Sequence, residues 1–152
     1  MERRGLYMCG RFTLVNVAEL FARFQLEEQS YHLSSRYNIA PSQEIPVIIR
    51  NNGVNQLALC KWGLIPRWSK DPAWGAKLIN ARAETLEIKP SFKHSFQKRR
   101  CLIPADSFFE WKKEGNRKVP YRFLLKRGEL FAFAGLWDQW TGPDGQEIKS
   151  CT

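Results

Sequence analysis

The residue with the most unusual potential chemistry in this sequence is Cys9, which directly follows Met8. Removal of that methionine would leave an α-amine and a thiol on one residue. The amine condenses with an aldehyde to an imine, and the neighbouring thiolate then closes a five-membered thiazolidine ring. The amine titrates near pH ~8 and the thiol near ~8.5, so both reactive forms exist at neutral pH. Taken alone, a small buried residue at a strand start is the simpler explanation of Cys9.

Residues 78–84 alternate between apolar and polar side chains, which predicts a strand. On such a strand Asn80, Arg82 and Glu84 would share one face. An arginine binds phosphate oxygens and an asparagine binds a carbonyl or hydroxyl group, so this face could hold a sugar-phosphate. An ordinary solvated strand face explains the same pattern and is the simpler interpretation of this segment by itself.

Glu110 is surrounded by aromatic residues in the sequence Phe108-Phe109-Glu110-Trp111. Aromatic neighbours would remove water from the carboxylate, which favours its protonated form and suits a general acid–base catalyst. A solvent-facing position on an edge strand explains this residue equally well.

The segment from Trp62 to Pro72 contains two prolines and a glycine, so we expect a loop. Within it, Arg67 and Trp68 combine a cation with an aromatic ring. Such a pair can hold a phosphate and stack on a base, or wedge into a base step. Burial in the core is the alternative for the tryptophans, and it suits Trp62 better than Trp68.

The elements that must position these residues are mostly short strands. Residues 17–24 have helical spacing after Asn16, a reasonable N-cap. Residues 45–50 and 56–61 flank Asn51-Asn52-Gly53, a hairpin signal. We further expect a short basic helix at 90–100, strands at 101–103 and 108–111, a charged turn at 112–119, and a strand pair at 121–125 and 130–137. The pattern predicts an α+β domain that is mainly β, with a curved, barrel-like antiparallel sheet and a few short helices.

Composition and charge narrow the class of protein. Lys and Arg outnumber Asp and Glu to give a net charge of +9, which makes a polyanion a plausible partner, although a basic charge that serves solubility explains it as well. The four cysteines contain no CxxC motif, and His32 and His94 complete no zinc pattern, so we expect no metal. The start of the chain has no signal-peptide pattern, and its longest apolar run, 131–137, is too short to span a bilayer. We therefore expect a soluble protein of a reducing compartment, the cytoplasm.

Six short motifs follow one another in a fixed order between Cys9 and Trp111. They are Cys9-Gly10-Arg11-Phe12, Arg36-Tyr37-Asn38-Ile39-Ala40-Pro41, Trp62-Gly63-Leu64-Ile65-Pro66, Ile79-Asn80-Ala81-Arg82-Ala83-Glu84-Thr85, Cys101-Leu102-Ile103-Pro104-Ala105 and Phe109-Glu110-Trp111. In this order they resemble the SOS-response-associated peptidase family, also called abasic-site processing proteins. Each motif is weak alone, but together they form a specific signal that covers nearly the whole chain.

The resemblance implies a shallow, positively charged groove for single-stranded DNA that contains abasic sites. It also implies a covalent thiazolidine between an N-terminal Cys9 and the ring-opened sugar aldehyde of the lesion. By resemblance, Asn80 orients and polarises the sugar oxygen, and Glu110 transfers protons. The DNA-binding residues implied by the resemblance and by the loop composition are Arg11, Asn38, Arg67, Trp68 and Arg82. No cofactor is implied, and we expect a monomer that is associated with the nucleoid if the organism is a bacterium.

The sequence departs from the family pattern at both ends. We expect residues 1–8 to be a misassigned start or a leader that is removed, because an amide nitrogen on Cys9 could not form an imine. We expect residues 9–152 to form the family domain, truncated at its C-terminal end. The family's catalytic histidine would lie beyond Thr152, and His32 and His94 have the wrong context to replace it. Residues 147–152 are expected to be the first half of an unfinished hairpin.

Two other functions are compatible with the sequence. A non-catalytic barrel that binds single-stranded nucleic acid would explain the positive charge and the aromatic residues equally well. A thiol peptidase acting on other proteins would need a base near the thiol, usually a histidine, and neither histidine lies in such a motif. Removal of the residues before Cys9 is the only peptidase activity that we expect.

Overall fold

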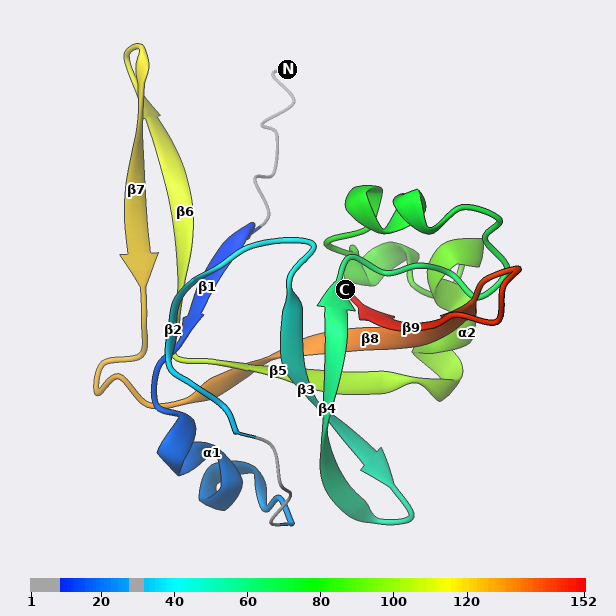
Figure 1. Ribbon diagram of the computed structural model, residues 1–152. Helices are drawn as coiled ribbons and strands as arrows, with labels where there is room; N and C mark the ends of the chain where they lie inside the picture. Colours follow the sequence, from blue (N-terminus) through cyan, green and yellow to red (C-terminus); the bar gives the residue numbers. More distant parts are fainter. Residues whose placement is uncertain (1–8, 28–31) are drawn as a thin grey trace.

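The computed structural model describes residues 9–27 and 32–152, and most of its regular structure is β-strand (Figure 1). Two short α-helices and two short 3₁₀ segments accompany the strands in the described residues, which agrees with the predicted α+β class. The elements are β1 (Arg11–Leu14), α1 (Val17–Phe24), β2 (Arg36–Ile39), β3 (Glu44–Asn51), β4 (Val54–Trp62), η1 (Pro72–Lys77), η2 (Ala83–Thr85), α2 (Pro90–Lys98), β5 (Arg100–Ala105), β6 (Ser107–Glu114), β7 (Arg117–Phe123), β8 (Phe131–Thr141) and β9 (Glu147–Cys151).

Five strands close into a barrel in the order β3-β4-β9-β8-β5. The predicted hairpin of β3 and β4 is confirmed, with Asn52 and Gly53 at positive φ in its turn. The last strand, β9, pairs with β8 in antiparallel fashion and with β4 in parallel fashion. The expectation of an unfinished hairpin at 147–152 is therefore wrong, because both edges of β9 have hydrogen-bonded partners. No local feature of the sequence indicates the parallel pairing of β9 with β4, because the two strands are more than 80 residues apart in the chain.

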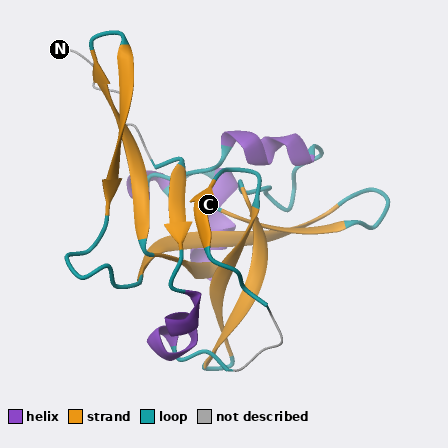
Figure 2. Ribbon diagram, turned by 60° about the vertical axis from the view of Figure 1, so that its left-hand side comes forward, coloured by secondary structure: helices purple, strands orange, loops and turns teal. Residues whose placement is uncertain are grey.

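A second sheet has the order β2-β1-β6-β7 and carries the start of the described chain. Its β6–β7 hairpin extends well beyond the barrel in both ribbon views, with α1 far from the hairpin tip (Figures 1 and 2). The predicted pairing of 121–125 with 130–137 is wrong: β7 pairs with β6, and β8 pairs with β5 and β9. Gly115 and Asn116 form a two-residue turn, so the expected charged turn at 112–119 is mostly strand.

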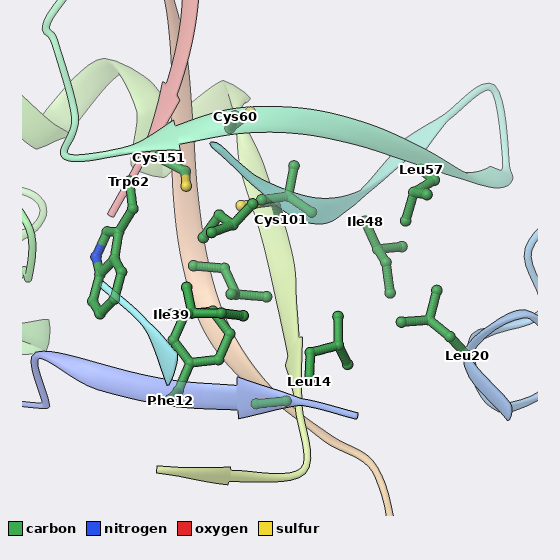
Figure 3. Packing of buried hydrophobic residues seen from close by; sticks show 14 of the residues in the cluster. Phe12, Leu14, Leu20, Ile39, Ile48, Leu57, Cys60, Trp62, Cys101 and Cys151 are labelled. Carbon is green, nitrogen blue, oxygen red and sulfur yellow. The ribbon is translucent and has the colours of Figure 1, made fainter. Parts of the chain in front are cut away.

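The main core lies where β1 and α1 pack against the barrel. Phe12 and Leu14 of β1 point toward the barrel side chains, and Leu20 of α1 joins the same cluster (Figure 3). The ring of Phe12 lies edge-on to Trp62, with 5.3 Å between ring centroids. Trp62 is thus a core residue, as the sequence favoured. Phe12 lies three residues after Cys9 in the chain. The packing of Phe12 in the core therefore also restricts where Cys9 can lie.

Helix α1 has the predicted bounds, but the residue that secures its entry was not predicted. The side chain of Asn16 accepts no cap hydrogen bond from the helix, and its Nδ2 instead donates to the carbonyl of Gly128, at 3.3 Å. The buried carboxylate of Asp106 accepts from the backbone N–H of Val15 and from that of Asn16, the latter at 3.0 Å. It also accepts from the hydroxyl of Thr13. One acidic side chain at the β5–β6 junction therefore positions the segment between β1 and α1.

Candidate active site

Cys9 lies immediately before β1 and is half-buried. Its Sγ donates a hydrogen bond to the carbonyl of Arg11, at 3.1 Å. Burial raises the pKa of the Cys9 thiol, and the nearby carboxylate of Glu110 raises it further. The thiol is therefore accessible but is held largely protonated at neutral pH, so a proton acceptor is needed for it to react.

Asn80 contacts Cys9 directly, since its Nδ2 donates to the carbonyl oxygen of Cys9 at 2.8 Å. The predicted strand at 78–84 is wrong: residues 78–82 are irregular and Ala83–Thr85 form η2. The segment bonds instead to neighbouring loops and side chains, because Leu78 accepts from the N–H of Leu64 and Ile79 accepts from the indole of Trp62. These contacts direct Asn80 toward Cys9 without any strand ladder.

Glu110 lies on β6, opposite Tyr121 of β7. Desolvation raises the pKa of its carboxyl group, which confirms the direction expected from its aromatic neighbours. A shallow hollow formed with Trp111, Lys112, Tyr121 and Phe123 surrounds it. Its charge acts on the Cys9 thiol. The structure therefore brings the three predicted catalytic residues to one place: Cys9, Asn80 and Glu110.

A pocket of about 420 Å³ opens beside Cys9 and Asn80. Most of its lining is apolar, from side chains of the barrel, of β1 and of the segment before α2. The apolar members include Phe12, Trp62, Leu86, Phe96, Phe133 and Leu136. Such a lining excludes water from one side of the thiol and leaves Asn80 among the few polar groups on that wall.

Arg11 and Asn38 form a second group close to Cys9. The guanidinium Nη1 of Arg11 donates to Oδ1 of Asn38, at 2.8 Å, across the paired strands β1 and β2. Asn38 is exposed and Arg11 is half-buried. The pair places a positive charge two residues from the thiol, where an anionic ligand would meet it.

The other predicted DNA-binding residues are distributed between two places. Arg67 and Trp68 contact α2: Arg67 Nη1 lies 3.0 Å from Nε2 of His94, and the indole of Trp68 donates to the carbonyl of Pro90 at 3.4 Å. Arg82 is exposed and lies two residues after Asn80. The role of His94 as the neighbour of Arg67 was missed, because nothing in the sequence indicates that α2 packs against this loop.

The other three cysteines are buried in the core, from strands β4, β5 and β9 (Figure 3). Burial raises the pKa of Cys101 to about 12, with a contribution from Cys60. A hydrogen bond with the Cys60 side chain, together with burial, raises the pKa of Cys151. Thiolate is the reactive form, so these groups should be inert in the folded protein.

Iodoacetamide at pH 8 is therefore expected to modify Cys9 at least about 100-fold faster than the other three cysteines, because Cys9 is half-buried whereas the others are at most 6% exposed. Peptide mapping by mass spectrometry at timed intervals measures this ratio. The same reaction in concentrated urea is the control and should label all four residues. Equal rates in the native protein would contradict the burial described above.

The described residues were also compared with the requirements of a metal site and of a membrane-spanning helix. Across residues 9–27 and 32–152, no three His, Cys, Asp or Glu side chains are grouped so that they could hold a metal ion. In the same part of the chain, none of the helices has the length and apolar character needed to cross a membrane.

The fold and the site define a mainly β protein whose half-buried cysteine lies just before β1, in the sheet beside the barrel. The family model described as SOS response associated peptidase (SRAP) matches residues 8–152. The chain belongs to this family. The matched region begins at Met8, so Cys9 is its second residue.

Comparison with individual proteins agrees with this assignment. The chain is 48% identical over 151 residues to "Abasic site processing protein YoqW" of Bacillus subtilis, a match covering 95% of this chain and 66% of the relative. It is 33% identical to "Abasic site processing protein YedK" of Escherichia coli, covering 85% and 59%. A crystal structure of a protein from Bacteroides thetaiotaomicron superposes with a TM-score of 0.82 at 28% identity, covering 95% and 66%. The chain therefore spans about two thirds of the length of these relatives.

Proposed function

We propose that this protein processes abasic sites in single-stranded DNA, as a DNA repair factor in the response to DNA damage, by forming a thiazolidine between Cys9 and the lesion. The observation that carries the proposal is the half-buried Cys9 thiol, held beside Asn80 and Glu110 at the start of the family match. The names of the curated relatives support the substrate class.

The reaction has two bond-forming steps. The α-amine of Cys9 attacks the C1′ aldehyde of the ring-opened deoxyribose, and the resulting carbinolamine loses water to form an imine. The Cys9 sulfur then adds to the imine carbon and closes the five-membered ring, with a proton transferred from the thiol to the nitrogen. One water leaves, and no oxidant or reductant is needed.

Asn80 and Glu110 support different parts of this sequence. Because Asn80 donates to the Cys9 carbonyl at 2.8 Å, it holds the backbone of the residue whose nitrogen and sulfur must both face the aldehyde. Glu110 supplies the proton transfers. Its raised pKa lies closer to neutral pH than that of an ordinary glutamate, so the carboxyl group can more readily both donate and accept a proton. Arg11 and Arg82 would bind phosphates on either side of the lesion.

The mechanism requires that the nitrogen of Cys9 be a free amine. Residues 1–8 lie outside the described part of the structure, so their role comes from chemistry alone. We propose that the active form begins at Cys9, through translation from Met8 or through removal of a leader. The intact mass of the purified protein tests this, and an active protein that retains residues 1–8 would disprove it.

Denaturing electrophoresis tests the function. A protein that begins at Cys9 is incubated with a single-stranded oligonucleotide carrying one abasic site, then heated in detergent. We expect a band whose mass equals protein plus oligonucleotide minus one water. An oligonucleotide with a normal base in place of the lesion is the control and should give no band. Failure of the abasic oligonucleotide to form the adduct would reject the proposal.

A second candidate is non-covalent binding of single-stranded nucleic acid. The net charge of +9 and exposed aromatic residues such as Trp68 favour it. It predicts an affinity that falls steeply with salt, through release of counterions, and equal binding of intact and abasic oligonucleotides with no covalent product. The same gel therefore separates the two functions.

Replacing Glu110 with glutamine is expected to slow adduct formation about 100-fold without lowering stability. Desolvation raises the pKa of this carboxyl group in the folded state, so its contribution to stability is greatest below its ordinary pKa and is lost as the pH rises through the folded pKa. At neutral pH the carboxylate is ionised at a cost to stability, and a neutral amide removes that cost. The rate comes from a gel time course and the Tm from thermal unfolding.

Glu114→Gln is the matched control for that variant. Glu114 lies on the same strand, is exposed, and pairs with Lys112 at 3.1 Å. Its replacement should leave the rate of adduct formation unchanged. Equal rates for Glu110→Gln and the unmodified protein would remove Glu110 from the mechanism.

A further inference from the structure

The pocket of about 420 Å³ beside Cys9 is poorly matched to a sugar-phosphate chain. Its lining does not include the residues proposed above to bind phosphates or to transfer protons, which are Arg11, Arg82 and Glu110. The charged residue of the lining, Arg100, is exposed, and its Nε donates to the carbonyl of Phe96 at 2.8 Å. A phosphate among the remaining apolar groups would lose its hydration without gaining partners. The pocket therefore suits an apolar part of a ligand.

The wall opposite α2 leaves apolar surface open to solvent. Leu102 of β5 and Ala134 of β8 lie directly opposite each other in the barrel, and both line the pocket and are exposed. Leu102 is 42% exposed, although it is a large apolar side chain. Pockets of roughly 300–1,000 Å³ hold drug-sized ligands, so this one has room for an apolar chain of about eight carbons. Each methylene group buried there favours binding about threefold.

The side chain of Thr152 independently indicates a ligand in this pocket. Thr152 lines the pocket and is only 9% exposed, and its Oγ1 is buried with no hydrogen-bond partner among the described residues. Its backbone N–H and carbonyl are both paired with Leu136, at 2.9 Å, so the hydroxyl alone lacks a partner. Buried hydroxyl groups in folded proteins nearly always have one. A bound molecule with an oxygen atom would supply it.

We propose that Cys9 also captures free apolar aldehydes, with the aldehyde group at Cys9 and the tail in this pocket. The inference rests on the proposed function in one respect, since it needs the same free α-amine. The amine attacks the carbonyl carbon, and the carbinolamine loses water to give an imine. The Cys9 sulfur then adds to the imine carbon while the thiol proton passes to the nitrogen. One water leaves, no oxidant or reductant is needed, and the occupied Cys9 can no longer react with DNA.

Competition between octanal and propanal tests the proposal. A protein that begins at Cys9 is equilibrated with equal concentrations of the two aldehydes, and intact mass spectrometry measures each adduct as protein plus aldehyde minus one water. We expect the octanal adduct to exceed the propanal adduct by a factor on the order of 100, because the longer tail buries more methylene groups. Free cysteine forms the same ring without a pocket and should show a ratio near one. A similar ratio for the protein would overturn the proposal.

Ala134→Phe places a ring in the pocket from an exposed position on β8, and it should lower the preference for octanal about 10-fold while leaving the propanal adduct unchanged. Thr141→Phe is the matched control, because Thr141 is exposed on the same strand and does not line the pocket. Leu102→Gln, at an exposed position, makes the same wall polar and should lower the preference as well. Thermal unfolding shows that each variant is folded. An undiminished preference in folded Ala134→Phe and Leu102→Gln would place the tail elsewhere and overturn the proposal.

The outcomes separate this inference from the proposed function. If the abasic oligonucleotide forms its adduct but the protein shows no preference for octanal, aldehyde capture in the pocket fails and the function stands. If octanal is preferred but no DNA adduct forms, the function fails and the capture stands. Cys9→Ser should give no stable adduct with either aldehyde. An octanal adduct that persists in this variant would place the aldehyde on another residue and would overturn the capture by Cys9.

Discussion

Cys9→Ala, in a protein that begins at residue 9, is expected to lower the yield of heat-stable adduct with abasic single-stranded DNA by a factor on the order of 100 or more. Alanine keeps the α-amine, so an imine still forms, but imines hydrolyse when the protein is denatured. The thiol stabilises the product because it lies on the same residue as the imine, where ring closure has the high effective concentration of an intramolecular reaction. Quantification of the gel-shifted band measures the effect.

Two variants distinguish lost chemistry from lost structure. Cys9→Ser retains the size of the side chain and a hydrogen-bond donor for the Arg11 carbonyl, which Sγ contacts at 3.1 Å, so it should fold and bind like the unmodified protein. Its hydroxyl is a weaker nucleophile than a thiol and should give little stable adduct. Cys60→Ala removes a fully buried thiol that does not line the pocket beside Cys9, and it should cost stability while retaining the adduct. Normal crosslinking by Cys9→Ala would show that another residue bonds to the DNA.

The parts of the fold that could be predicted from sequence depend on neighbours along the chain. The turn Asn51-Asn52-Gly53 specifies its hairpin because Asn52 and Gly53 adopt positive φ readily, and residues 17–24 place apolar side chains on one helical face. The α+β class, the loop after Trp62 and the short helix before β5 are confirmed for the same reason. Each follows from local periodicity or turn chemistry.

The errors occur where a segment's partners are remote. The alternation in 78–84 predicted a strand, yet the carbonyl of Leu78 accepts from Leu64 in a loop, and Asn80 bonds to Cys9, which is 71 residues away. Burial does not alternate along this segment in the structure, because residues 78–81 are all half-buried and residues 82–84 are all exposed. The alternation of residue types therefore did not mark the two faces of a strand. The pairing of β9 with both β4 and β8 likewise depends on barrel closure.

In the candidate site, too, the local features could be predicted from the sequence and the contacts between remote segments could not. The residue types of Cys9 and Glu110 suggested their chemistry, and the raised pKa of the carboxyl group has the expected cause. Their proximity, and the positioning of Cys9 by Asn80, come from β1 pairing with β6 and from the path of residues 78–82. Asp106 was not identified at all, because an aspartate next to a strand usually indicates a turn.

Asp106→Ala is expected to destabilise the protein by about 3 kcal/mol, the largest effect on folding that we predict. The carboxylate is only 4% exposed and accepts from the hydroxyl of Thr13 and the backbone N–H groups of Val15 and Asn16. Alanine would leave the backbone N–H groups of Val15 and Asn16 without this acceptor in a place that water reaches poorly, and a buried donor without a partner costs more than the bond contributed. Urea unfolding followed by circular dichroism measures the loss.

Asp144→Ala is the matched control for that variant, because Asp144 is an exposed turn residue that accepts from the N–H of Gln146 at 3.1 Å, and its loss should cost less than about 1 kcal/mol. Asp106→Asn should restore only part of the stability, since an amide has one acceptor oxygen and its NH₂ group would face a donor. The damage should extend to catalysis: Asp106 fixes the residues after β1, and β1 carries Cys9 at its other end. A folded Asp106→Ala protein should therefore form the adduct more slowly at saturating DNA. Unchanged stability would show that the β1–α1 segment is held by packing alone.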